Sequence, residues 1–139
     1  MIRVVAVGRL KASWAQEACA EYARRARRYA RVEVVEVADR EPVEAGRRLL
    51  EAARGRPLVA CDPGGEALSS QELADLLGRH GSPCFLVGGP DGLSDEVRHG
   101  CDRRLSLGPL TLPHELARVV LLEQIYRGLS ILKGHPYHR

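Results

Sequence analysis

Short apolar runs alternate along this chain with longer segments of mixed polarity. The runs are rich in valine, leucine and isoleucine and end near glycine or proline, which is typical of buried strands. They lie at residues 2–7, 32–37, 58–61, 84–87 and 104–107. The intervening segments open with serine or proline, as helices do. They predict helices at residues 14–30, 42–54, 70–79, 95–100 and 113–133.

Strands that are apolar at nearly every position are buried on both faces, as parallel strands covered by helices are. We therefore expect an α/β fold with a parallel five-stranded sheet and helices on both faces. The turn at residues 62–65 (DPGG) is expected to close the third strand. The chain predicts a single domain, residues 1–139, because no linker or repeat interrupts the alternation.

The composition, 45% apolar and 28% charged, is that of a globular protein. No apolar run approaches the roughly 18 residues that a membrane span needs. The first strand begins at Ile2, which leaves no room for a signal peptide, so we expect a cytoplasmic protein. The cysteines at positions 19, 61, 84 and 101 lack metal-ligand spacing, so we expect free thiols and no metal site. A net charge of +3 neither requires nor excludes nucleic acid.

Two loops that follow strands are candidate ligand sites. Residues 88–92 (GGPDG) lack both phosphate-loop spacings, and Pro90 has no amide donor to offer a phosphate. This loop is either a bare turn or a turn that lets a ligand approach its backbone closely. Residues 107–112 (LGPLTL) form an apolar loop, which we expect to be buried. Its backbone groups then need partners, either a ligand with adenine-like edges or another packed element.

The segment 113–133 is apolar nearly all round, which indicates burial on several sides and a subunit interface on one of them. Within it, Glu123 and Arg127 are spaced either for a structural ion pair or for a catalytic role. The arginines at positions 24, 27, 28 and 31 share one face of the first predicted helix. They form either a solvated face or a stripe of phosphate contacts.

The chain ends in His135, Pro136, Tyr137, His138 and Arg139. We expect this tail to contact a ligand and not to pack, because tyrosine and histidine stack on bases and arginine binds phosphate. A disordered terminus is the alternative.

Three segments carry a specific resemblance: residues 88–94 (GGPDGLS), 105–127 (LSLGPLTLPHELARVVLLEQIYR) and 135–139 (HPYHR). With them, the chain resembles the small knotted methyltransferases of the SPOUT class. More narrowly, it resembles the bacterial ribosomal RNA large subunit methyltransferase H family over essentially its whole length. The resemblance implies a SPOUT-like fold with a C-terminal trefoil knot, S-adenosylmethionine as cofactor, and a homodimer. The implied activity is methylation of N3 of a pseudouridine in large-subunit (23S) rRNA. We expect that rRNA to be part of an assembled ribosome, and free rRNA is the alternative.

The resemblance also implies site residues. The cofactor contacts carried over by position are Cys61, Gly88, Leu107, Gly108, Pro109, Leu110, Thr111 and Leu112. His138, His114 and Glu123 are the candidates for the base that removes the N3 proton. Tyr137 and Arg139 are expected to hold the nucleotide, with the tail of one subunit completing the site of the other. A non-catalytic RNA-binding or ribosome-assembly factor on the same fold is the alternative, and it would not bind S-adenosylmethionine.

Overall fold

A computed structural model describes residues 1–79 and 81–138. Five strands form one sheet, in the order β2-β1-β4-β3-β5, and every neighbouring pair is parallel. The strands are β1 (Ile2–Val7), β2 (Val32–Val37), β3 (Leu58–Ala67), β4 (Cys84–Val87) and β5 (Arg103–Ser106). This confirms the prediction of a parallel five-stranded α/β fold.

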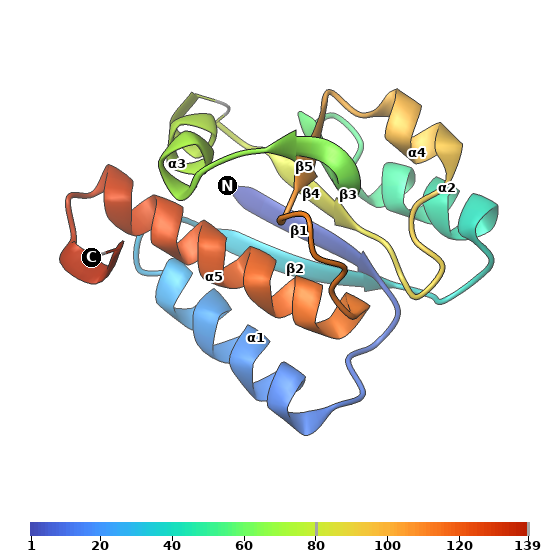
Figure 1. Ribbon diagram of the computed structural model, residues 1–139, viewed down its shortest axis with the longest axis horizontal. Coiled ribbons are helices and arrows are strands. Elements are labelled where there is room, and N and C mark those ends of the chain that lie inside the picture. Colours follow the sequence, from blue (N-terminus) through green and yellow to red (C-terminus); the bar gives the residue numbers. More distant parts are fainter. Residues whose placement is uncertain (80, 139) are drawn as a thin grey trace.

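Helices cover both faces of the sheet, as the apolar strands predicted (Figure 1). The helix α5 (His114–Leu132) packs between α1 (Ser13–Ala26) and α3 (Ser70–Arg79) on one face. On the other face lie α2 (Pro42–Ala52) and α4 (Asp95–Gly100), which contact each other. A short 3₁₀ turn, η1 (Pro136–His138), follows α5. Among the described residues, no helix is long and apolar enough to cross a membrane.

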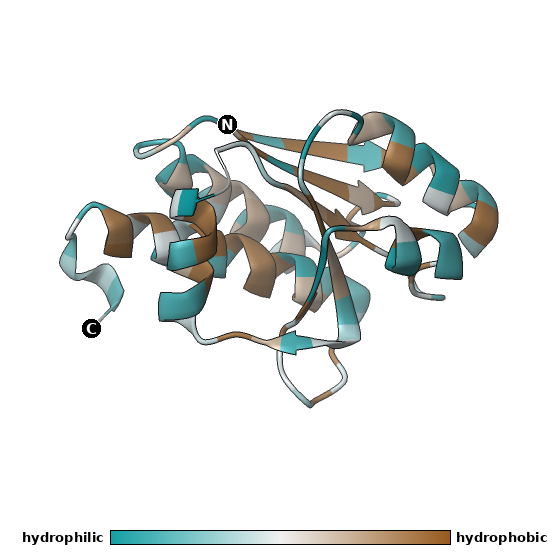
Figure 2. Ribbon diagram, turned by 90° about the horizontal axis from the view of Figure 1, so that it is seen from above, coloured by the Kyte–Doolittle hydropathy of each residue, from teal (hydrophilic) through white to brown (hydrophobic). Residues whose placement is uncertain are grey.

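The two central strands supply both halves of the core. Val4 pairs in register with Phe85, and Val5 with Leu86, and all four side chains are fully buried. Val4 and Phe85 face α1 and α5, while Val5 and Leu86 face α2. Burying each such side chain contributes about 1.5–3 kcal/mol. Apolar residues are therefore needed at successive positions of these strands (Figure 2).

The predicted turn at residues 62–65 is wrong, because β3 continues through it to Ala67. Its pairing with β5 is interrupted between Cys61 and Glu66, both of which align with Leu105. Glycine makes this irregularity possible. A Cβ at Gly65 would lie 2.6 Å from the backbone carbonyl carbon of Arg104.

The ends of several elements also differ from the prediction. The first helix ends at Ala26 and not near residue 30, and β5 lies one residue earlier than expected. Ser13 is the first residue of α1 and not its cap, and Ala12 at the cap position offers no side-chain acceptor. Instead, the carboxylate of Glu115, from α5, accepts hydrogen bonds from the backbone N–H groups of Lys11 and Ala12.

The strand order places a reversal between β1 and β4. The chain leaves β1 toward β2 on one side, and it leaves β4 toward β5 on the other. Ligands of open α/β sheets bind outside the carboxyl ends of strands at such a reversal. The trefoil knot that the resemblance implies stays a prediction.

Candidate cofactor cavity and C-terminal cluster

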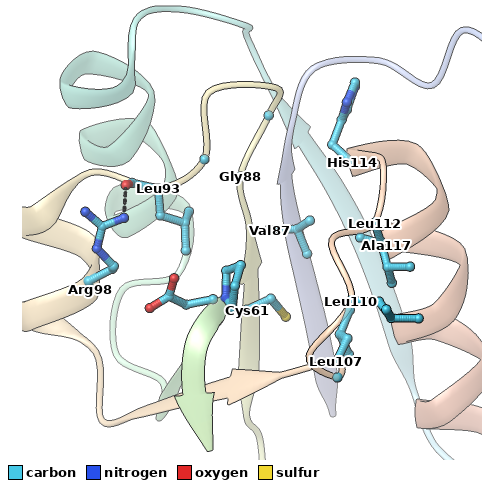
Figure 3. Close-up of a pocket in the computed structure, with 15 residues that line it drawn as sticks. Cys61, Val87, Gly88, Leu93, Arg98, Leu107, Leu110, Leu112, His114 and Ala117 are labelled. Atoms are coloured by element: carbon cyan, nitrogen blue, oxygen red, sulfur yellow. Dashed lines mark hydrogen bonds between the residues drawn. The ribbon is translucent and has the colours of Figure 1, made fainter.

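A cavity of about 380 Å³ lies at the carboxyl end of β4, beside the irregularity of β3 at Cys61 and the loop that follows β5 (Figure 3). Six of the eight predicted cofactor residues line it: Cys61, Gly88, Leu107, Gly108, Leu110 and Leu112. Pro109 and Thr111 belong to the same loop without lining the cavity. The structure therefore brings the three predicted strand ends together around one space.

The loop after β4 is a tight turn. Gly89 and Gly92 form an antiparallel bridge, and Gly92 has a φ of +76°, a conformation that favours glycine. A Cβ at Gly88 would lie 2.7 Å from the backbone carbonyl carbon of Gly92. The turn itself therefore requires glycine at position 88, because a side chain there would collide with Gly92. The backbone of this turn lines the cavity.

The centre of the loop 107–112 is exposed, so the expectation that the loop is buried is wrong. Leu110 has 79% of its surface exposed. Ser106 bonds both backbone groups of Gly108 through its hydroxyl, at 3.0 Å to the oxygen and 3.2 Å to the nitrogen. Within the described chain, the backbone groups of residues 109–112 have no hydrogen-bond partner. The exposed centre leaves these groups to water or to a ligand.

Cys61 is the cysteine at the cavity wall. Burial raises the pKa of the Cys61 thiol to about 12, so the thiol is protonated at neutral pH. All four cysteines are free, as expected, and burial also raises the pKa of Cys84 to about 11. Cys61 contributes shape and apolar surface to the cavity.

His114 opens α5 directly beside the cavity and lines it. The next two polar side chains of the helix reach back to the segment after β1. Glu115 accepts hydrogen bonds from the N–H groups of Lys11 and Ala12, at 2.8 and 3.1 Å. Those donors hold the pKa of the Glu115 carboxyl below its ordinary value, with the bond from Ala12 the larger cause.

Arg118 is the one charged side chain of α5 that is fully buried, with 2% of its surface exposed. Its guanidinium donates to Glu36 at 2.6 Å and to the carbonyl oxygens of Val7 and Gly8 at 3.3 and 3.0 Å. Arg118 was not among the predicted site residues. Its position on the same helical face as the core residues Leu121, Leu122 and Ile125 was the available signal.

The tail packs against the protein, contrary to expectation. The ring of Tyr137 lies 4.3 Å from that of Tyr126, and its hydroxyl donates to Glu123 at 2.8 Å. Arg127 lies over the same ring at 4.9 Å. Burial and the bond to Glu123 raise the pKa of the Tyr137 hydroxyl. A tyrosine next to a partly apolar helix end can bury its ring and keep its hydroxyl bonded.

Glu123 is occupied by this cluster. Its carboxylate accepts from Arg127 at 2.6 Å and from Gln124 at 2.8 Å, in addition to Tyr137. The structural ion pair that the spacing allowed is therefore present, and Glu123 does not line the cofactor cavity. His138 is exposed, with Nδ1 3.0 Å from the carbonyl oxygen of His135. Arg139 lies outside the described residues.

Within one chain, His114 of the cavity is the first residue of α5 and the tail follows its last residue, so the two lie at opposite ends of the helix (Figure 1). The helix has 19 residues, which corresponds to a length of about 28 Å. Tyr137 and His138 are therefore not brought together with His114, the other predicted residue of the reaction.

The arginine stripe on the first helix does not form as predicted. The helix ends at Ala26, before Arg27, Arg28 and Arg31. Arg24 and Arg25 both bond Glu21, and Arg27 donates to the carbonyl oxygen of Val32. The alternative of a solvated face fits Arg24 and Arg25, which are paired with Glu21 on the surface of the same helix.

Six residues outside the predicted site residues and the candidate loop 88–92 also line the cavity: Asp62, Pro63, Val87, Leu93, Arg98 and Ala117. Arg98 donates to the carbonyl oxygen of Leu93 at 2.6 Å (Figure 3). It also pairs with Asp95. It lies on α4, which Ser94 caps by accepting from the N–H of Val97. The only sequence signal was their position near a selected strand end or beside a selected loop.

The sequence of the chain is similar to that of a known protein family. Residues 1–138 match the model of a predicted SPOUT methyltransferase. Ribosomal RNA large subunit methyltransferase H of Thermus thermophilus is 47% identical, over 99% of this chain and 98% of its own. The protein of that name from Gloeobacter violaceus is 46% identical, over 99% and 97%.

A solved structure shares the fold at low sequence identity. A probable methylase family protein from Haemophilus influenzae superposes with a TM-score of 0.61 at 15% identity, covering 99% of this chain and 70% of the other. The fold, the cavity at the three strand ends and the full-length similarity agree. The chain belongs to the SPOUT methyltransferases, and within them to the ribosomal RNA large subunit methyltransferase H family.

Proposed function

We propose that this protein transfers a methyl group from S-adenosylmethionine to N3 of a pseudouridine in large-subunit (23S) rRNA. The observation that carries the proposal is the cavity beside Cys61 of β3 and the carboxyl end of β4. Two of the segments that carry the resemblance, 88–94 and 105–127, line it, and residues 1–138 match the SPOUT methyltransferases. The ribosome is the particle that contains the substrate, so we propose a cytoplasmic enzyme that acts on assembled ribosomes.

The cavity has the chemistry that this cofactor requires. Apolar side chains such as Leu107 and Leu112 form its walls, and the backbone groups of Leu110 and Leu112 are free to pair with the polar edge of an adenine. Gly108 has a φ of +126°, which favours glycine, and the space at its Cβ position is open. The absence of a side chain there leaves room in the cavity for a ligand. When bound, S-adenosylmethionine supplies a methyl group on a cationic sulfur.

The chain's own residues hold the acceptor and accept its proton. The N3 imide of a uracil ring must lose its proton before or during methyl transfer, so a nearby base accelerates the reaction. His114 lines the cavity in the same chain, and His138 is exposed and available to a second subunit. Glu123 is bonded by three donors and is the weakest of the three candidates.

We propose a homodimer in which the tail of one subunit completes the site of the other. The length of α5 supports this arrangement, because a tail about 28 Å from its own cavity cannot act there. The outward face of α5 carries partly exposed apolar side chains at positions 116, 119, 120 and 131, and Leu132 has 44% of its surface exposed. A second copy would cover this face.

One experiment separates this activity from that of a non-catalytic ribosome-assembly factor. The modifications of 23S rRNA are mapped by mass spectrometry in cells with and without the gene, and S-adenosylmethionine binding is measured by calorimetry. We expect loss of one N3-methylpseudouridine without the gene, and saturable cofactor binding. An unchanged modification map together with no cofactor binding contradicts the proposal and favours the assembly factor.

A further inference from the structure

A second cavity, of about 650 Å³, adjoins the cofactor cavity. It lies at the carboxyl ends of β1 and β2, with Gly8 and Val37 in its wall, and Pro90 from the loop after β4 closes one side. His114 lines both cavities. The second cavity therefore spans the reversal of strand order between β1 and β4, where ligands of such sheets bind.

A methyl acceptor has to occupy a space that adjoins the cofactor, because the reacting atoms must approach to about 3–3.5 Å. Two other cavities also share residues with the cofactor cavity. In one, Arg98, Arg103 and Arg104 are each paired with a carboxylate. The other, beside α3 and α5, has no lysine or arginine in its lining. Neither offers an unpaired cation to a phosphate.

The second cavity does offer unpaired cations. Arg9 and Lys11 line it and are exposed. In the part of the chain that the structure describes, neither side chain makes an ion pair or a hydrogen bond. Of the carboxylates in the wall, Glu36 is neutralised by Arg118, and Asp39 lies beside Gly8. A carboxylate at that point can accept a hydrogen bond from an N–H group of a base.

These cations are held in place relative to the cofactor cavity. Arg118 bonds the carbonyl oxygens of Val7 and Gly8, and Glu115 bonds the N–H of Lys11. Both anchors belong to the first turns of α5, which begins directly after the cofactor loop. The segment that carries the two cations is thus tied to the helix that borders both cavities.

We propose that the second cavity is the nucleotide subsite: the target base enters it beside His114, and Arg9 and Lys11 bind the phosphates that flank that base. This inference rests on the proposed function. Phosphate contacts position a nucleic acid without reading its sequence. Arg9 and Lys11 are therefore substrate-binding residues whose removal weakens rRNA binding and spares cofactor binding.

The test uses Arg9→Ala, Lys11→Ala and the double variant, with ribosomes from cells that lack this gene as substrate. We expect each single variant to lower kcat/KM for ribosomes about tenfold, mainly through KM, as expected when one charged hydrogen bond is removed. The slope of log(kcat/KM) against log(salt) should become shallower by about 0.7–0.9 for each phosphate that is no longer bound. Arg9→Lys should keep most of the activity, and S-adenosylmethionine affinity should be unchanged throughout.

The matched control is Arg54→Ala. Arg54 is an exposed arginine between α2 and β3, at the amino ends of the strands and away from both cavities, and its removal should change nothing. A double variant with the parental kcat/KM overturns the subsite, and so does a variant with reduced cofactor affinity, because the cations then serve the cofactor. An unsubstituted protein that methylates no ribosome refutes the proposed function itself, which is a distinct result.

Discussion

The two ends of α5 are built in different ways, although both carry residues expected to act in one reaction. At the first end, Glu115 and Arg118 bond backbone groups of a distant segment, and His114 borders two cavities. At the last end, Tyr137 packs on Tyr126 and bonds Glu123 in a compact cluster of side chains. The first end of α5 therefore borders two cavities, whereas the last end is a closely packed cluster of side chains.

This contrast shows that a segment at the terminus of a chain can contribute to the packing of the fold. Tyr137 has two tasks under our proposal, as part of its own subunit's cluster and as part of the partner's site. Activity alone cannot distinguish them, so each variant below needs a stability measurement beside the assay.

Deleting residues 137–139 should have the largest effect. Methylation should fall by orders of magnitude, because the absence of positioning alone can account for several kcal/mol of barrier. The deletion should also cost about 1–3 kcal/mol of unfolding free energy, since it removes the packing of one aromatic ring and one hydrogen bond. Ribosome methylation and urea unfolding measure the two effects. A truncated protein with normal turnover refutes a catalytic tail.

Gly88→Val should abolish S-adenosylmethionine binding, measured by calorimetry. The added side chain meets the backbone of Gly92, so the turn that shapes the cavity has to open. Gly100→Val is the matched control, because a Cβ at Gly100 has no neighbour within 4 Å. Unchanged cofactor affinity in Gly88→Val would place the cofactor elsewhere.

Val120→Glu should dissociate the proposed homodimer, because it places an unpaired charge in the interface at a cost of about 3–5 kcal/mol. Light scattering at micromolar concentration measures the mass. Val43→Glu is the control, since Val43 is an exposed apolar residue on α2, on the other face of the sheet. A protein that is monomeric without any substitution contradicts the dimer outright.

Two substitutions compare the ends of α5 directly. Arg118→Met should lower the unfolding free energy by about 1–3 kcal/mol, because it leaves the buried carbonyl of Val7 without its donor. Tyr137→Phe keeps the ring and removes one hydrogen bond, so its cost should be about 1 kcal/mol. Urea titrations measure the loss of unfolding free energy in each variant. Equal losses would contradict a stronger attachment at the first end of α5.

The smallest effect is a pH dependence at Glu115. Its pKa is held below the ordinary value of 4.5, so its contribution to stability is present above that value and disappears as pH falls through the lower folded pKa. The difference in unfolding free energy between the parent and Glu115→Gln should therefore be constant at neutral pH and vanish in acid. A difference that persists at pH values well below 4.5 would falsify this assignment.

The sequence predicted those parts of the molecule that depend on local pattern. The strands around Val4 and Phe85 are apolar at successive positions because both faces are covered, and that pattern is visible in the chain itself. The extension of β3 through residues 62–65 was missed, because its partner β5 lies some forty residues further along. The anchoring by Arg118 was missed for the same reason, since Glu36 is 82 positions away. Membership of a family supplied the site residues, and the geometry then distinguished those at the cavity from those at the far end of α5.

The bonds from α5 to the segment after β1 have a consequence for the order of folding. Residues 7–12 are made first, but their anchors, Glu115 and Arg118, leave the ribosome more than 100 residues later. Contacts between such distant positions form late, because the long intervening loop must close first. We therefore expect a nascent chain to lack an ordered cofactor cavity, and an anchored segment at Arg9 and Lys11, until its last helix has emerged.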